Sequence, residues 1–319
     1  MLKALLLFLS HAGWARTIVT RWRFARRAAT RFVAGETLED ALRAFRALER
    51  RGLMATLCQL GEHVSSEAEA HAATVDYLRV LDRICTAAVR ANASLKLTEL
   101  GLAIDWEMCK ENLSQVVTKA AECGIFIRID MEDSSTVDRT LEIYRALRAG
   151  GLANVGLVIQ AYLYRSQDDM RALLSEGARI RLCKGAYQET PKVAFPKKAD
   201  VDRNYDRLAG MMIEAAVRQG GEPTSADGRI PAPPAFATHD PQRITFARNF
   251  AEQAGLSKRG LEFQMLYGIR GDLQQALANE GYPVRVYVPY GTEWYPYYVR
   301  RLAERPANLW FFLSNILRG

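Results

Sequence analysis

Short apolar runs of strand character alternate with longer amphipathic segments along most of this chain. Eight such runs are rich in branched and aromatic residues, and helical spacing of apolar residues separates them. In parallel sheets, each connecting helix returns the chain to the edge where the previous strand began. The pattern therefore predicts parallel βα units, with strands at residues 53–57, 94–98, 125–130, 155–160, 179–183, 235–238, 261–265 and 284–291.

Eight parallel units can close into a barrel or remain an open, doubly wound sheet. A closed (β/α)8 barrel needs about 250 residues, and residues 52–319 supply that length. No predicted strand is followed by G-x-G-x-x-G, the dinucleotide fingerprint of many open sheets. We therefore expect one (β/α)8 barrel domain at residues 52–319, preceded by a basic N-terminal helical segment at residues 1–51.

Cysteine and histidine usage gives little sign of cross-links or metal sites. The chain has 319 residues, 49% of them hydrophobic, which is ample material for a large core. Its four histidines lack metal-ligand spacing, so no metal site is predicted. The cysteines are odd in number and form no CxxC pair, so we expect reduced thiols in a cytoplasmic compartment. They are Cys58, Cys85, Cys109, Cys123 and Cys183.

The net charge of +7 lies entirely in residues 1–51, which hold eleven Lys and Arg but four Asp and Glu. A neutral barrel argues against nucleic acid as a partner. The apolar run at residues 4–9 is far shorter than the roughly 20 residues that span a bilayer. We favour a helix that packs on the barrel or one that lies peripherally on the inner face of a membrane. A transit peptide stays open as well, because no acidic residue precedes Glu36.

Polar side chains gather where the predicted strands end. Barrel enzymes carry their functional residues at the carboxyl ends of the strands. A buried polar group there costs desolvation energy unless it is paired or contacts a ligand. We therefore expect a functional site at this end of the barrel. The residues are Lys96, Asp130, Gln160, Arg181, Lys184, Thr238, His239, Asp240, Gln264, Tyr267 and Tyr287.

The last predicted helix carries a second concentration of charge. Tyr297, Arg300, Arg301 and Glu304 fall at i, i+3, i+4 and i+7, so they share one helix face. Two forked guanidiniums beside aromatic rings suit a planar carboxylate, which a lysine pair would grip less specifically. The alternative is a solvated face on which Arg300 and Glu304 form an i,i+4 ion pair.

Seven short motifs occur in order from residue 95 to residue 304. R-x-x-K-G-A-Y at 181–187 and Y-x-x-R-R-x-x-E at 297–304 are the most specific. The other motifs are Leu95-Lys96-Leu97-Thr98, Ile129-Asp130-Met131-Glu132-Asp133, Ile159-Gln160-Ala161-Tyr162, Ala237-Thr238-His239-Asp240 and Phe263-Gln264-Met265-Leu266-Tyr267-Gly268. Together these motifs resemble bacterial monofunctional proline dehydrogenase and the matching domain of the bifunctional proline utilisation A protein.

This resemblance implies a flavoprotein with a distorted (β/α)8 barrel. It implies an oxidoreductase that uses FAD to oxidise L-proline to Δ1-pyrroline-5-carboxylate, the first step of proline catabolism. The hydride would pass to flavin N5 and the electrons to a membrane quinone. A Δ1-pyrroline-5-carboxylate dehydrogenase would be a further partner.

The resemblance also assigns roles to individual residues. Substrate binding falls to residues that grip the carboxylate (Lys96, Arg300, Arg301), surround the ring (Leu266, Tyr287, Tyr297) or hold the arginines (Glu304). FAD binding falls to residues at the isoalloxazine (Met131, Gln160, Arg181), at the ribityl and phosphate groups (Lys184, Gly185, Ala186) and at the dinucleotide (Thr238, His239). The catalytic residues are Arg181, beside flavin N5, and Asp130, which would orient Lys96 or Arg181.

Competing interpretations stay open for several of these residues. Lys96 and Asp130 could form a structural pair, and His239 could cap the helix that follows it. Lys96 or Lys184 could instead be the Schiff-base amine of an aldolase-class barrel. A non-enzymatic membrane-associated protein, led by the basic residues 1–51, is a further alternative.

Overall fold

The structure is a computed structural model that describes residues 31–61 and 64–304, with backbone alone from residue 300 onward. Most of the predicted N-terminal helical segment therefore lies outside the described residues. Within the described part, no helix combines the length and the apolar character that a bilayer crossing requires.

Eight parallel strands form a closed barrel in sequence order, and β8 pairs with β1 to complete it. Each predicted strand corresponds to an observed one, so the predicted (β/α)8 barrel is confirmed. The strands are β1 (Met54–Gln59), β2 (Ala91–Leu95), β3 (Ile127–Ile129), β4 (Val155–Gln160), β5 (Ile180–Cys183), β6 (Pro234–Ala237), β7 (Glu262–Leu266) and β8 (Val284–Tyr290).

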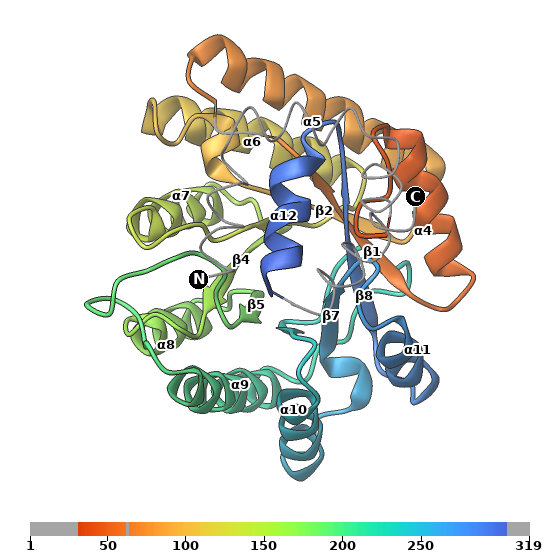
Figure 1. Cartoon of the computed structure of the whole chain (residues 1–319), viewed down its shortest axis with the longest axis vertical. Helices are drawn as coiled ribbons and strands as arrows, with labels where there is room; N and C mark the ends of the chain where they lie inside the picture. The colour runs from red at the N-terminus through yellow and green to blue at the C-terminus, as the bar shows by residue number, and fades with distance from the viewer. Residues whose placement is uncertain (1–30, 62–63, 305–319) are drawn as a thin grey trace, which may run out of the picture.

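Helices α4 to α11 ring the barrel on its outside (Figure 1). Local sequence sets several of their starts. For example, the Ser66 and Asp105 side chains accept hydrogen bonds from the first turns of α5 and α6. The helices are α4 (Leu38–Glu49), α5 (Glu67–Ala87), α6 (Trp106–Glu122), α7 (Val137–Ala149), α8 (Ser166–Ser175), α9 (Lys198–Arg218), α10 (Pro241–Gln253), α11 (Gly271–Asn279) and α12 (Trp294–Glu304), with short 3-10 turns η1 (Leu97–Leu100) and η2 (Lys258–Gly260).

Polar and charged side chains occupy part of the barrel interior. Because alternate residues of a strand face the same side, Arg285 and Tyr287 of β8 share a face, as do Glu262 and Gln264 of β7. Arg285 and Glu262 are completely buried and form an ion pair, with 2.7 Å between Arg285 Nε and Glu262 Oε1. Glu262 Oε1 also accepts a 2.6 Å hydrogen bond from Gln264 Nε2. Such further hydrogen bonds help to offset the desolvation of a buried ion pair. They also connect the inward-facing residues in one polar network.

The Gly/Pro-rich stretch at residues 220–234 partly closes the amino end of the barrel. The Gly228 carbonyl accepts a 2.8 Å hydrogen bond from Arg285 Nη2. Gly228 has φ +72°, and a Cβ there would lie 2.9 Å from Met54 Sδ. Local composition predicts such a loop but not the buried arginine to which it binds.

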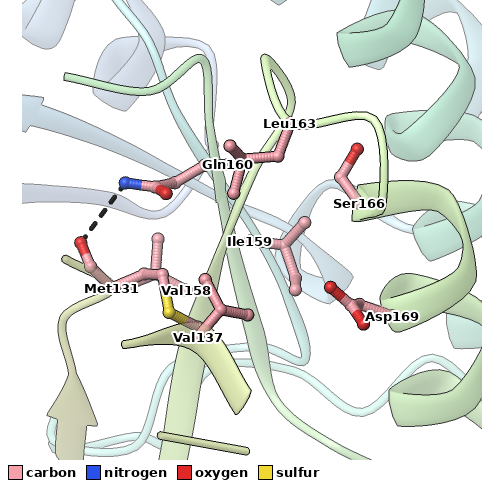
Figure 2. A pocket seen from close by; sticks show the side chains of 8 residues that line it. All are labelled: Met131, Val137, Val158, Ile159, Gln160, Leu163, Ser166 and Asp169. Atoms are coloured by element: carbon pink, nitrogen blue, oxygen red, sulfur yellow. Dashed lines mark hydrogen bonds between the residues drawn. The ribbon is translucent and has the colours of Figure 1, made fainter. Parts of the chain in front are cut away.

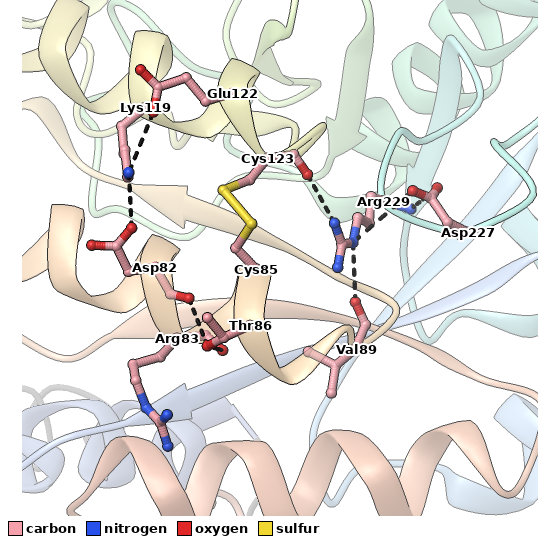
Figure 3. The surroundings of a disulfide bond; sticks show 10 residues. All are labelled: Asp82, Arg83, Cys85, Thr86, Val89, Lys119, Glu122, Cys123, Asp227 and Arg229. Atoms are coloured by element: carbon pink, nitrogen blue, oxygen red, sulfur yellow. Dashed lines mark hydrogen bonds and ion pairs between the residues drawn. A yellow bond between two sulfur atoms is a disulfide. The ribbon is translucent and has the colours of Figure 1, made fainter.

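A disulfide joins Cys85, near the end of α5, to Cys123, which caps α6. Figure 3 shows Arg229 beside it, donating to the carbonyls of Cys123 and Val89 at 2.8 and 3.3 Å. The expectation of reduced thiols is therefore wrong for this pair. Cysteines 38 residues apart become neighbours because α5 and α6 pack side by side, which their sequence spacing does not reveal.

Helix α12 lies over the carboxyl end of the barrel and appears at the centre of Figure 1. Its aromatic residues Trp294, Tyr295, Tyr297 and Tyr298 belong to one apolar cluster. This cluster also contains Cys58 and Leu60 from the end of β1, with Leu266 and Tyr287 packed against it. The helix thus covers the strand ends at which polar side chains were expected to gather.

Candidate active site

Asp130 is the centre of a hydrogen-bonded cluster at the carboxyl end of the barrel. Asp130 Oδ1 accepts from Ser94 Oγ and Arg181 Nη1, each at 2.7 Å, and Oδ2 accepts from the Tyr287 hydroxyl at 2.7 Å. Burial, followed by the Asp130 charge, raises the pKa of Tyr287 well above its usual value, so the phenol keeps its proton. Three donors leave this carboxylate suited to orienting Arg181 rather than to removing a proton.

Arg181 lies inside this cluster with 7% of its side chain exposed. Its guanidinium carbon is 5.4 Å from the centre of the Tyr287 ring, a cation–π distance. Its Nε donates to Gln264 Oε1. Arg181 therefore presents a fixed positive charge beneath α12.

Lys96 pairs with Glu99 rather than with Asp130, with 2.8 Å between Lys96 Nζ and Glu99 Oε1. The Tyr77 hydroxyl donates to the other Glu99 oxygen at 2.7 Å. Burial lowers the pKa of Lys96, but the Glu99 charge opposes it strongly enough that the pKa is raised overall. The ammonium therefore stays charged at the barrel end. The proposed structural pair of Lys96 with Asp130 does not form, because each residue pairs with another side chain.

Gln160 ends β4 and is 3% exposed. Its Nε2 donates to the Met131 carbonyl at 3.3 Å, while its Oε1 has no hydrogen-bond partner among the described residues. A buried acceptor without a donor costs free energy, so this atom is available to a ligand that carries an N–H group.

A small cavity lies behind Gln160, between β4 and helices α7 and α8. Figure 2 shows the Met131 sulfur beside Val137 and Val158 in this cavity. Met131 therefore offers backbone rather than sulfur toward the barrel end. The lining residues are Met131, Val137, Val158, Ile159, Gln160, Leu163, Ser166 and Asp169.

Lys184 is held between two carboxylates. Its Nζ contacts Asp202 of α9 and lies 2.7 Å from Asp240 Oδ2, next to the start of α10. It thus joins the loop after β5 to two helices, and its charge is already neutralised by these partners.

Close packing and backbone conformation both constrain Gly185. A Cβ at Gly185 would lie 2.2 Å from Tyr162 Cδ1, and the residue has φ +119°. Close packing on Tyr162, together with this backbone conformation, therefore requires glycine regardless of any phosphate. Ala186 is exposed beside it.

Thr238 and His239 follow β6 and stabilise local backbone. Thr238 Oγ1 accepts from the Asp240 amide at 3.1 Å, and His239 Nε2 accepts from the Leu266 amide at 3.0 Å. The cap of α10 is Asp240, whose side chain accepts from the Gln242 amide. His239 thus supports Leu266 instead of capping the helix.

The predicted substrate pocket is only partly described. Leu266, Tyr287 and Tyr297 come together in or against the apolar cluster beneath α12. Arg300, Arg301 and Glu304 lie on the α12 backbone, but their side chains lie outside the described residues. Among the described residues, no group of three or more His, Cys, Asp or Glu side chains is placed to hold a metal ion.

Sequence reasoning missed Ser94 and Glu99 as partners of the predicted site residues. Ser94 donates to Asp130 and Glu99 pairs with Lys96. Serine is an ordinary strand residue and Glu99 lies in η1, so neither carries a motif. Their position beside Lys96 in the sequence is the one signal that could have drawn attention to them.

The comparisons with known proteins agree with this arrangement. The family model described as proline dehydrogenase matches residues 41–312. Proline dehydrogenase of Deinococcus radiodurans is 42% identical over 295 residues, covering 91% of this chain and 90% of that relative. Proline dehydrogenase 1 of Bacillus subtilis is 39% identical over 318 residues, covering 100% of both.

Comparison with solved structures also supports the fold. Proline utilization A from Bdellovibrio bacteriovorus, inactivated by N-propargylglycine, superposes with a TM-score of 0.79 at 27% identity. The match covers 91% of this chain and 34% of that longer protein. Both the family model and full-length relatives cover the barrel and the residues that converge at its carboxyl end, so this chain belongs to the proline dehydrogenase family.

Proposed function

We propose that this chain oxidises L-proline to Δ1-pyrroline-5-carboxylate with FAD bound at the carboxyl end of the barrel. Membership in the family makes it a proline dehydrogenase, an enzyme of proline catabolism. The observation that carries the proposal for this site is the cluster of Asp130, Arg181 and Tyr287 beneath α12. It provides a fixed cation at the end of the barrel where this fold places its chemistry.

The described residues fit the isoalloxazine end of FAD. Gln160 offers a buried carbonyl oxygen without a donor, which suits an N–H group of the flavin. Arg181 offers a guanidinium that would lie near flavin N5. At the phosphate end, Lys184 is already paired, so we propose that it shapes the loop at Gly185 and Ala186. We propose Thr238, His239 and the Met131 backbone as the remaining contacts.

Bound FAD would supply the hydride acceptor, its N5 atom, for oxidation of the substrate ring. The chain supplies orientation and charge for that transfer. Lys96, Arg300 and Arg301 would bind the proline carboxylate and Glu304 would hold the two arginines. Binding the carboxylate at fixed points would hold the reacting carbon of the substrate ring in an orientation from which hydride transfer can occur. Arg181 would stabilise the negative charge that develops on transfer.

The ring of proline needs an apolar enclosure that excludes water. Leu266, Tyr287 and Tyr297 come together beneath α12 and are suited to that role. Tyr287 contributes twice, because its hydroxyl also fixes Asp130. We propose that this enclosure holds the proline ring beneath α12.

We further propose that a membrane quinone accepts the electrons and that a Δ1-pyrroline-5-carboxylate dehydrogenase uses the product. The family resemblance supports both partners. Similarity to the bifunctional protein PutA of Escherichia coli, 28% identical over 317 residues, is consistent with the second. Peripheral contact with a membrane through residues 1–51 belongs to the same proposal, and the barrel domain would begin at residue 52.

The aldolase alternative fits the lysines poorly. A Schiff-base lysine needs a lowered pKa so that its amine is free to attack. The pKa of Lys96 is raised instead, and Lys184 lies between two aspartates. Neither ammonium is prepared for nucleophilic attack.

Replacing either arginine of α12 tests the proposal. We expect Arg300→Met and Arg301→Met each to raise the proline KM by about tenfold or more, because each removes charged hydrogen bonds to the carboxylate. The flavin absorbance spectrum should not change. Arg171→Met on α8, where the arginine is exposed and paired with Asp168, is the control. An unaltered proline KM in both variants would refute the carboxylate assignment.

A further inference from the structure

Gln264 connects the proposed site to the buried ion pair deeper in the barrel. Its Oε1 accepts from Arg181 Nε, and its Nε2 donates to Glu262 Oε1 at 2.6 Å. Gln264 is 5% exposed, so water competes little for these bonds. One amide therefore joins the guanidinium at the barrel end to a carboxylate below it.

That carboxylate is itself held in place. Glu262 accepts two hydrogen bonds from Arg285: Nε donates to Oε1 at 2.7 Å and Nη2 donates to Oε2 at 2.9 Å. This is the bidentate arrangement of a guanidinium and a carboxylate. Arg285 also donates to the backbone carbonyls of Ala55 and Gly228, at 3.0 and 2.8 Å. The lower end of the network is thus anchored to β1 and to the loop that closes the amino end of the barrel.

These charges determine the orientation of the Gln264 amide. An ionised carboxylate only accepts hydrogen bonds, and a guanidinium only donates them. The NH2 group must therefore face Glu262, and the carbonyl oxygen must face Arg181. Rotating the amide by half a turn would place two acceptors together and two donors together.

We infer that Gln264 is a positioning residue for Arg181, with the Glu262–Arg285 pair fixing its amide. Asp130 holds Nη1 of the guanidinium from one side, and Gln264 holds Nε from the other. Two separate attachment points restrict rotation of the planar group, which Asp130 alone does not do. This inference rests on the proposed function, because it assigns Arg181 a role toward bound FAD.

The test is the midpoint potential of the bound flavin in Gln264→Met, which keeps the side-chain length but removes both hydrogen bonds. A positive charge held near N5 favours the electron-rich reduced flavin, so loosening Arg181 lowers the potential. We expect the reduction equilibrium to become about tenfold less favourable, because the displaced guanidinium would lose interaction with the reduced flavin worth about one charged hydrogen bond. That change corresponds to about 30 mV for two electrons.

A matched control separates positioning from general loss of a buried amide. Asn112 of α6 is 1% exposed and donates to the Leu100 carbonyl at 3.1 Å, away from this network. Asn112→Leu should lower thermal stability without moving the flavin potential. Equal shifts in both variants would overturn the inference.

A double-mutant cycle decides whether Gln264 acts through Arg181. In an Arg181→Met background, Gln264→Met should change the reduction equilibrium by less than about twofold, because the guanidinium is gone. If Gln264→Met still changed the reduction equilibrium tenfold in the Arg181→Met background, the inference would be overturned. The same holds if Gln264→Met did not change this equilibrium in the parent protein. If the parent protein bound no flavin, the proposed function itself would fail, which is a separate outcome.

Discussion

At the scale of single residues, the site depends on where charge is held and by what partner. Lys96 keeps its proton because Glu99 compensates for its burial, and Tyr77 in turn fixes Glu99. The pKa of Lys96 is raised above the usual lysine value of about 10.4, so deprotonation requires strongly alkaline solution. Proline, in contrast, must lose its ammonium proton before it can give up a hydride.

We predict that Lys96→Met raises the proline KM by about tenfold, because it removes a cation from the carboxylate site. The factor should be the same at neutral and mildly alkaline pH, since Lys96 does not titrate there, while kcat/KM of both proteins rises with pH. The control is Lys110→Met, which removes an exposed pair with Glu107. A KM equal to that of the parent would show that Lys96 does not bind substrate.

At the scale of elements, the loop after β5 is shaped by close packing. Gly185 lies against the ring of Tyr162, and the Tyr162 amide donates to the Lys184 carbonyl at 2.8 Å. The same lysine reaches α9 and the start of α10. This loop is therefore fixed from three directions where it leaves β5, the strand that carries Arg181.

We predict that Gly185→Ala lowers the free energy of unfolding by about 3 kcal/mol, from left-handed backbone strain plus a steric clash. Gly177→Ala is the control, because Gly177 has φ +69° but no atom lies within 4 Å of the methyl group that alanine would add. It should cost about 1 kcal/mol. Urea denaturation measures both; equal losses would mean that Tyr162 moves aside without cost.

Element order could be predicted from sequence because the periodicity of strands and helices is local. All eight predicted strands overlap observed ones, from 53–57 with β1 to 284–291 with β8. The side-chain partners could not be predicted in this way. Lys184 contacts Asp240, which is 56 residues away in the sequence, and Arg181 contacts Gln264, which is 83 residues away. Such pairs depend on the register of the barrel strands rather than on the local sequence pattern.

At the scale of the whole molecule, the two ends of the barrel differ: packing and a disulfide stabilise the amino end, and the proposed active site lies at the carboxyl end. The loop at 220–234 and the Cys85–Cys123 disulfide reinforce the amino end (Figure 3). Helix α12 covers the carboxyl end. The site residues could be chosen from the resemblance, but the disulfide could not, because odd cysteine number and spacing argued against it.

We predict that reducing the disulfide lowers the free energy of unfolding by about 2–4 kcal/mol, because it closes a loop between residues 38 apart. The double variant Cys85→Ser, Cys123→Ser should be equally destabilised and insensitive to reductant. Thiol titration of the unfolded protein without reductant should find three free cysteines. Five free thiols would contradict the bridge.

The central claim is that proline bound beneath α12 reduces a flavin held at the carboxyl end of this barrel. Anaerobic titration of the purified protein with L-proline, followed by visible absorbance, tests it most directly. We predict a flavin spectrum that bleaches as proline is added and recovers when a quinone analogue is supplied. A protein without flavin absorbance, or a flavin band that proline leaves unchanged, would contradict the account.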